Sequence, residues 1–244
     1  MPVTNMGCRW RYGMQEFYDT TSGEVVGVNA QVVKFDDFNG PAVDNTNDWN
    51  VTAVNAGTVT SVDGFGILTS GGADDDNVEL ASDLIFNGTS GAVAECKLRN
   101  DDVLKQSFFF GFTDAITEGA DLIPLDFSNG GAYLSTASNA AGFVLDTDKT
   151  ANGDTLFCCS VMANTDTTPV TTGIVPVIST LYRLRVAISG TTAYFWVNDV
   201  FITSIASSIT AATPLCVYLG TINREIAANT LDVDYIRAWG GRTA

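Results

Sequence analysis

The stretch YRLRVAISGTTAYFWVNDVFITSI, residues 182–205, decides the fold class of this chain. Apolar and polar residues alternate before and after a turn at Ser189-Gly190, and a second turn at Asn198-Asp199 leads into a third apolar run. Alternation of this kind predicts strands with one buried face, and Gly, Asn and Asp favour the turns between such strands. The stretch therefore predicts three consecutive antiparallel strands.

Runs of the same kind continue on both sides of this stretch. They are rich in Val, Ile, Thr, Phe and Tyr, which pleated sheets favour, and Gly/Asn/Asp turns separate them. No window of helical length shows a sustained helical spacing of apolar residues. The pattern predicts an all-β sandwich or barrel, in which residues 115–154, the least patterned stretch, hold short strands and longer loops. The clearest runs are residues 92–99, 107–114, 155–162, 214–220 and 231–239.

The charge of the chain is strongly acidic, because 28 Asp and Glu residues outnumber 12 Lys and Arg residues and give a formal net charge of −16. Phosphate backbones and anionic membranes attract clustered Lys and Arg, so we expect neither nucleic acid nor a membrane as a partner. No apolar run is long enough to span a bilayer, and the first residues contain no apolar signal-peptide core. We therefore expect synthesis in a cytoplasm, without secretion by a signal peptide.

Two motifs near the end of the chain carry a family resemblance. Val197-Asn198-Asp199 closes one strand with a tight turn, and VDYIRAW at 233–239 forms the last strand-like run. In this order they resemble the back of concanavalin A-like lectins and glucanases, which have a laminarinase-like jelly roll. FDDFNG at 35–40, together with Trp49, resembles the first strand of such domains. The resemblance covers residues 35–239 and implies one two-sheet antiparallel β-sandwich, a jelly roll over residues 31–244.

Residues 1–30 form a predicted extended arm or hairpin in front of the sandwich. This segment is rich in aromatic residues and arginine, which are enriched in the cores of protein interfaces, so it is suited to docking on a partner. The alternative is that the arm packs on its own sandwich, since a chain terminus needs an anchor to be ordered. The residues expected to contact a partner are Arg9, Trp10, Arg11, Tyr12, Phe17 and Tyr18.

A second resemblance points to a use for the protein. The segment RWRYGMQEFYDTTSGE at 9–24, followed by AECKLRNDD and FFFGFTDA, is similar in style and order to structural proteins of tailed-phage virions. It implies a bacteriophage capsid decoration or cement protein that contacts the major capsid protein and its own copies, as a trimer on the virion surface. The alternative is a carbohydrate-binding, lectin-like module or a phage adhesin that recognises a host glycan.

The sequence predicts that the chain is not an enzyme. The glucanases that it resembles use a Glu-x-Asp-x-(x)-Glu strand motif, and the closest two of its six glutamates lie eight positions apart. Asp232 and Asp234 alternate onto one face of a strand, but in the resembled family that strand carries no chemistry. The absence of histidine excludes Ser-His-Asp and Cys-His mechanisms.

Candidate ligand sites follow from residue chemistry. Aromatic rings beside Asp and Asn make sugar platforms, and the candidates are Trp49, Tyr194 and Trp196, with core packing as the alternative. The oxygen-rich segment 44–48 offers Asp44, Thr46 and Asp48 as calcium ligands, although Asp and Asn also favour plain turns. No other cofactor is expected. The five cysteines show no metal spacing and are predicted to be mainly buried free thiols.

Overall fold

The computed structural model of the chain describes residues 6–11, 14–19, 25–28, 31–46, 48–101, 105–127, 131–149 and 153–241, with side chains from residue 32 onward. Strands, turns and bends make up these residues, and none of them forms a helix. The prediction of an all-β, two-sheet antiparallel sandwich is confirmed. No described segment could cross a membrane as a helix.

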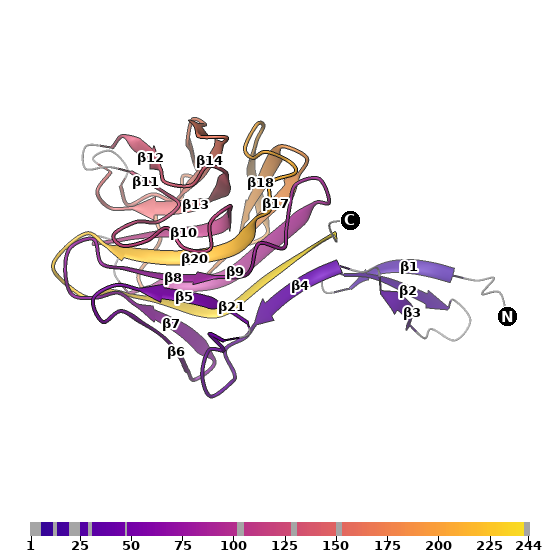
Figure 1. Ribbon diagram of the computed structural model, residues 1–244, viewed down its shortest axis with the longest axis horizontal. Coiled ribbons are helices and arrows are strands. Elements are labelled where there is room, and N and C mark those ends of the chain that lie inside the picture. Colours follow the sequence, from indigo (N-terminus) through magenta and orange to yellow (C-terminus); the bar gives the residue numbers. More distant parts are fainter. Residues whose placement is uncertain are drawn as a thin grey trace.

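One of the two large sheets, which we call the covered sheet, runs in the order β15-β14-β13-β10-β20-β8-β5, with β16 beside β14. Figure 1 labels its strands from β14 to β5. All its described neighbours pair antiparallel. Its strands are β5 (Asn50–Ala53), β8 (Asn77–Ala81), β10 (Gln106–Thr113), β13 (Ala140–Asp146), β14 (Phe157–Met162), β15 (Thr165–Asp166), β16 (Val170–Thr171) and β20 (Cys216–Asn223).

The second large sheet, which we call the open sheet, runs in the order β19-β18-β17-β9-β21-β7-β6, with β4 beside the end of β21. Residues 182–205 form its consecutive strands β17, β18 and β19, as predicted. The strands are β4 (Gln31–Asp36), β6 (Thr58–Val62), β7 (Phe65–Thr69), β9 (Ala92–Asn100), β17 (Tyr182–Ser189), β18 (Thr192–Val197), β19 (Val200–Ile205) and β21 (Thr230–Gly241).

The predicted arm contains a small antiparallel sheet of β1 (Met6–Arg11), β2 (Met14–Asp19) and β3 (Val25–Val28). Figure 1 draws it beyond β4, away from the two large sheets. These strands carry Arg9, Trp10, Arg11, Phe17 and Tyr18, but their side chains, and Tyr12 altogether, lie outside the described residues. The docking role of the arm therefore stays a prediction.

The main core lies between the two large sheets. On β10, Phe108, Phe110 and Phe112 face this core, whereas Phe109 points to the opposite side of the covered sheet. On β17, Leu184, Val186 and Ile188 supply the facing layer. Each fully buried Phe or Leu side chain contributes about 1.5–3 kcal/mol of hydrophobic stabilisation, so the strands of the open sheet turn their apolar faces toward this core.

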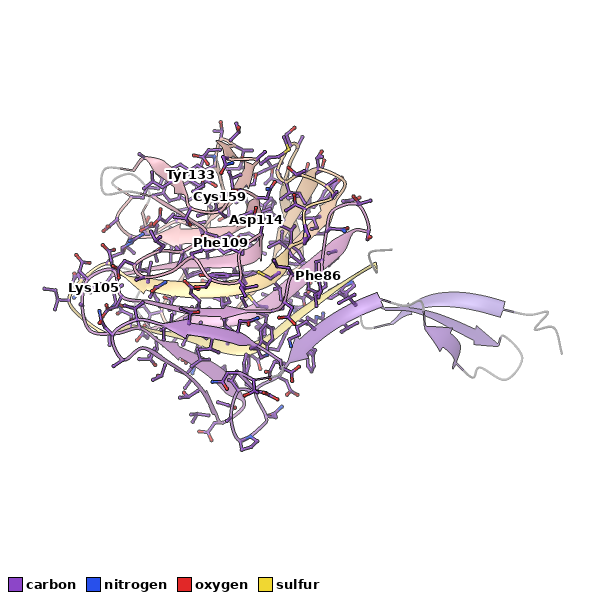
Figure 2. The ribbon with its side chains drawn as sticks, in the orientation of Figure 1. Phe86, Lys105, Phe109, Asp114, Tyr133 and Cys159 are labelled. Carbon is purple, nitrogen blue, oxygen red and sulfur yellow. The ribbon has the colours of Figure 1, made fainter. Side chains whose placement is uncertain are left out.

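A second, smaller core closes the outer face of the covered sheet. Residues 114–127 and 131–139, which we call the cover segment, carry β11 (Leu125–Phe127) and β12 (Tyr133–Ser135) and lie over β13 and β10 (Figure 1). Leu125 and Phe127 pack there with Phe109 and Cys159, and Figure 2 labels these last two near Tyr133 of β12. The stretch with the weakest sequence pattern thus provides both this cover and β13, an inner strand of the covered sheet.

Candidate functional site

The outer face of the open sheet carries half-buried aromatic side chains. On β18, Ala193, Phe195 and Val197 are buried in the main core, and Tyr194 and Trp196 point outward, as strand alternation requires. The Tyr194 and Trp196 rings stack with centroids 6.3 Å apart. The side chains of two of the three predicted ligand-binding residues therefore form one aromatic surface.

These rings line a groove of about 500 Å³, which we call the tryptophan groove. Trp239 of β21 forms its opposite side, and backbone and small side chains form the rest. A Cβ on Gly240 would lie 2.7 Å from the carbonyl oxygen of Gly91, so only glycine permits the close approach of these backbones. The other lining residues are Ser90, Gly91, Ala92, Val93, Ala187, Ile188, Ser189, Gly240 and Gly241.

Beside the groove, a buried carboxylate organises the charged side chains of this face. Glu95 of β9 is fully buried and pairs in register with Arg185 of β17 on one side and Arg237 of β21 on the other. Arg185 Nε donates to Glu95 Oε2 at 2.6 Å, and Arg237 Nη2 and the Tyr235 hydroxyl donate to Oε1 at 2.6 and 2.7 Å. Such charge-assisted bonds hold the side chains in fixed positions.

The electrostatics of Glu95 favour its ionised form. Burial by itself raises the pKa of this carboxyl, but the hydrogen bonds from Tyr235 and Arg185 and the charge of Arg237 outweigh burial and lower the pKa overall. Arg237 also lies over the rings of Tyr235 and Trp239, 5.5 and 5.2 Å from their centroids. Glu95 thereby fixes the position of Trp239 through Arg237.

A second hollow, of about 420 Å³, lies farther along β21, and we call it the aspartate hollow. A β-bulge at Asp234 shifts the register between β21 and β9, which turns both Asp234 and Tyr235 to the outer face. Asp234 forms an ion pair with Lys97 at 2.6 Å. The lining residues are Phe35, Asp37, Asn39, Asp63, Gly64, Phe65, Asp234, Tyr235 and Arg237.

The third predicted ligand-binding residue, Trp49, is placed elsewhere. It is buried with 3% exposed surface in the main core, and its Nε1 donates to Asp36 Oδ2 at 2.9 Å. Trp49 is therefore a packing residue and not a sugar platform. The prediction of Trp49 as a ligand-binding residue is wrong. The third aromatic side chain that lines the groove is Trp239, which was not among the predicted ligand-binding residues.

The predicted calcium ligands lie in a turn before β5. Asp44 Oδ1 accepts the backbone N–H of Thr46 at 3.0 Å, and Asp48 forms an ion pair with Lys34 at 3.0 Å. Within the described ranges, no three Asp, Glu, Cys or His side chains converge as a metal site would require. The calcium site therefore stays a prediction.

A glutamate of the covered sheet meets a glutamate of the cover segment beneath that cover. Glu79 of β8 is fully buried, and its carboxylate accepts the backbone N–H of Glu118 at 3.2 Å and Asn77 Nδ2 at 2.9 Å. Burial raises the pKa of Glu79 to about 7, and burial also raises the pKa of Glu118. The buried hydroxyl of Tyr218 lies near both carboxyl groups, and its pKa is raised by burial and by their charges. Glu79 and Glu118 lie 39 positions apart in the sequence, so a motif within one strand does not reveal this pair.

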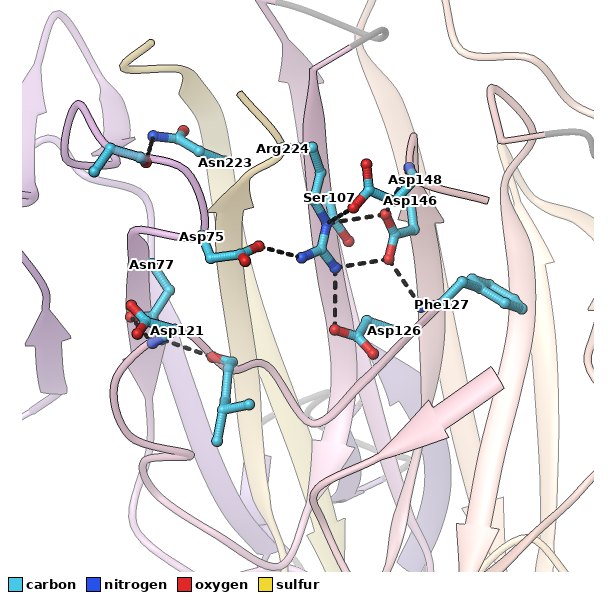
Figure 3. Close-up of polar contacts among 12 residues, drawn as sticks. Asp75, Asn77, Ser107, Asp121, Asp126, Phe127, Asp146, Asp148, Asn223 and Arg224 are labelled. Atoms are coloured by element: carbon cyan, nitrogen blue, oxygen red, sulfur yellow. Dashed lines mark hydrogen bonds and ion pairs between the residues drawn. The ribbon is translucent and has the colours of Figure 1, made fainter. Parts of the chain in front are cut away.

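An arginine with several carboxylates holds the same cover at its other end (Figure 3). Arg224, which follows β20, bonds Asp146 of β13 at 2.8 Å, Asp126 of β11 at 3.0 Å and Asp75 at 2.7 Å. The Arg224 side chain is 7% exposed and Asp146 is fully buried. The cluster joins the cover segment to the covered sheet by charge pairing in a poorly hydrated position.

The described cysteines are buried free thiols, as predicted. Cys158 faces the main core and its neighbour Cys159 faces the cover segment, so the adjacent pair points to opposite faces of β14. Burial raises the pKa of both thiols, which disfavours the reactive thiolate. Cys96 and Cys216 are also buried and free.

No protein-family model matches the chain, and no curated protein matches it in sequence. Solved structures do match it in fold. A β-glucanase of Bacillus licheniformis superposes with a TM-score of 0.56 at 10% identity, covering 84% of this chain and 97% of that chain. The κ-carrageenase from Pseudoalteromonas carrageenovora, solved with an oligotetrasaccharide of κ-carrageenan, gives 0.50 at 13%, covering 88% and 97%.

A third match comes from work on endo-acting O-glycanases of the human gut microbiota, with a TM-score of 0.58 at 12% identity over 86% of this chain and 98% of that chain. These neighbours are glycanases, and they contradict the expectation that the chain is not an enzyme, which rested on a motif within one strand. None of them gives support for a phage particle. At these identities the likeness shows the fold, and the chain has the concanavalin A-like jelly-roll fold of glycanases.

Proposed function

We propose that this chain binds carbohydrate on the outer face of its open sheet. The observation that carries the proposal is the tryptophan groove, where Tyr194, Trp196 and Trp239 present half-buried rings around a hollow of about 500 Å³. Aromatic rings offer an apolar face to the C–H side of a sugar, and the nearby hydroxyl and backbone groups can bond its hydroxyls. The glycanase neighbours support a carbohydrate ligand.

Glycan-array screening followed by calorimetry with the best glycan tests the proposal. Trp239→Ala removes one side of the groove, and we expect its affinity to fall by about fivefold or more, since a stacked ring contributes about 1 kcal/mol or more. Leu134→Ala is the control, because Leu134 is an exposed apolar side chain on β12 of the cover segment and does not line the groove. The proposal fails if no glycan binds, or if both variants bind like the parent protein.

A second candidate function, glycoside hydrolysis, is favoured by the Glu79–Glu118 pair. A carboxyl group with a pKa near 7 can serve as a general acid at neutral pH, and glycosidases use two carboxyl groups. Because Glu79 is fully buried, a substrate would reach it only after the cover segment moved. Release of reducing sugar from the array-selected glycan by the parent protein, and its loss in Glu79→Gln, tests this candidate.

The capsid decoration role remains a proposal of the sequence alone. The major capsid protein as partner, the trimeric state and the virion location are proposals of the same kind. Light scattering on the purified protein tests the trimer, since a monomer at all concentrations would remove the match to a local three-fold axis of a capsid.

A further inference from the structure

Two hollows lie on the same face of the open sheet and share the strand β21. Trp239 borders the tryptophan groove, and Tyr235 and Arg237 border the aspartate hollow. Tyr235 and Trp239 are four residues apart on one strand, which corresponds to about 13 Å. The Arg237 guanidinium covers the interval, because it lies against both rings. The two hollows therefore form one continuous surface.

The aspartate hollow has the chemistry of a sugar subsite. Phe35, Phe65 and Tyr235 supply rings, and Phe35 is 57% exposed. Asp37 and Asp63 supply exposed carboxylate oxygens that can accept hydrogen bonds from hydroxyl groups. Rings beside a few convergent polar groups are the usual composition of a small-molecule site.

The charges on this face select against acidic sugars. Among the described residues, each cation of the face has a carboxylate partner: Lys97 with Asp234, Arg99 with Asp232, Arg183 with Asp199, Arg185 with Glu95 and Asp199, and Arg237 with Glu95. Among the described residues Asp37 and Asp63 form no ion pair, and the whole chain carries −16. A sulfate or carboxylate on the ligand would meet repulsion without a cation to offset it.

We propose that the aspartate hollow is a second subsite for the glycan that the tryptophan groove binds, and that this ligand is an extended, uncharged oligosaccharide. The proposal rests on the proposed function, because it assigns a substrate class to the same face. A second copy of this chain is the competing occupant, since aromatic sheet faces also form interfaces. The experiment distinguishes these occupants.

The first measurement compares polysaccharides by affinity electrophoresis of the full chain. The neutral probes are mixed-linkage β-glucan, galactomannan and agarose, and the anionic probes are κ-carrageenan and alginate. We expect retardation by at least one neutral probe and none by the anionic probes. Stronger, salt-sensitive retardation by an anionic probe overturns the uncharged-ligand inference but leaves the proposed function standing, whereas no retardation by any probe counts against both.

The second measurement titrates oligosaccharides of increasing length, from disaccharide to hexasaccharide, cut from the retarding neutral glycan. Phe35→Ala and Asp63→Ala should weaken hexasaccharide binding by about tenfold and change disaccharide binding by less than about twofold. Trp239→Ala should weaken both. Equal effects of Phe35→Ala on both lengths, or none on either, overturn the second subsite. A stable dimer that Phe35→Ala dissociates, with glycan affinity unchanged, assigns the hollow to a second copy and also overturns it.

Discussion

Glu95 and Arg237 face each other in register across β9 and β21, and both Nε and Nη2 of the arginine donate to one carboxylate oxygen, at 3.1 and 2.6 Å. Arg185 bonds the other oxygen from β17. A single buried carboxylate thus connects three adjacent strands and fixes the polar surface beside the tryptophan groove. Removing this carboxylate would leave Arg237 without an ion-pair partner among the described residues and Arg185 with Asp199 alone.

We expect Glu95→Ala to lower the free energy of unfolding by about 3–5 kcal/mol, because two guanidinium groups lose their shared buried partner. Urea unfolding followed by fluorescence measures the change. The control is Asp199→Ala, which removes a half-exposed partner of Arg183 and Arg185 and should cost at most about 1 kcal/mol. Equal costs for the two variants would contradict the role assigned to burial.

Arg224→Met should destabilise the protein by about 3–5 kcal/mol, because the buried Asp146 and the largely buried Asp126 lose their common cation. Hydrogen exchange should show the largest loss of protection in β11 and β12, since Arg224 connects the cover segment to the covered sheet. Lys105→Met is the control, because the Lys105–Glu225 pair is exposed on both sides. Unchanged protection in β11 and β12 would show that the cover does not depend on this arginine.

Stability should depend on pH through Glu79. The folded protein holds this proton up to about pH 7, whereas the unfolded chain releases it near the ordinary value of 4.5. Between these values the folded state binds more protons, so this group reduces stability as pH rises from 4.5 to 7, by up to about 3 kcal/mol. Glu79→Gln should remove that part of the decline. Thermal melts of both proteins from pH 5 to 8 test this: parallel curves would refute the raised pKa.

Chelation provides a test of the predicted calcium ligands. Lys34 already neutralises Asp48, and Asp44 already caps the turn through Thr46, so we expect EDTA to leave the melting temperature unchanged. The matched experiment adds millimolar calcium to chelated protein. A rise in melting temperature that Asp44→Ala abolishes would establish the site against this expectation.

The sequence predicted which residues of a strand share a face, because successive side chains of a strand point to opposite sides of the sheet. It placed Tyr194 and Trp196 together on one face for this reason, since they stand on either side of Phe195 in a single strand. It could not place Trp49, because a buried indole that bonds Asp36 has the same local sequence as an exposed one.

Trp239 shows where local pattern reading ends. Uninterrupted alternation from Leu231 and Val233 would turn Trp239 into the core, but the bulge at Asp234 shifts the phase, so that Ile236 and Ala238 point inward instead. The change of apolar phase from Val233 to Ile236 was the available signal. The aromatic residues Tyr235 and Trp239 concealed it, since either face of a strand can hold them.

The sequence by itself determined the all-β class, the antiparallel order of strands β17–β19 and the acidic surface, because these depend on alternation, turn chemistry and charge along neighbouring residues. Only the tertiary structure decided which distant residues share a site. Glu79 meets Glu118 and Arg224 meets Asp75 across long stretches of chain. Trp196 and Trp239 line the same groove because the sheet order places their strands, β18 and β21, on either side of β17 and β9. Such meetings follow from the packing of whole sheets, and no local spacing encodes them.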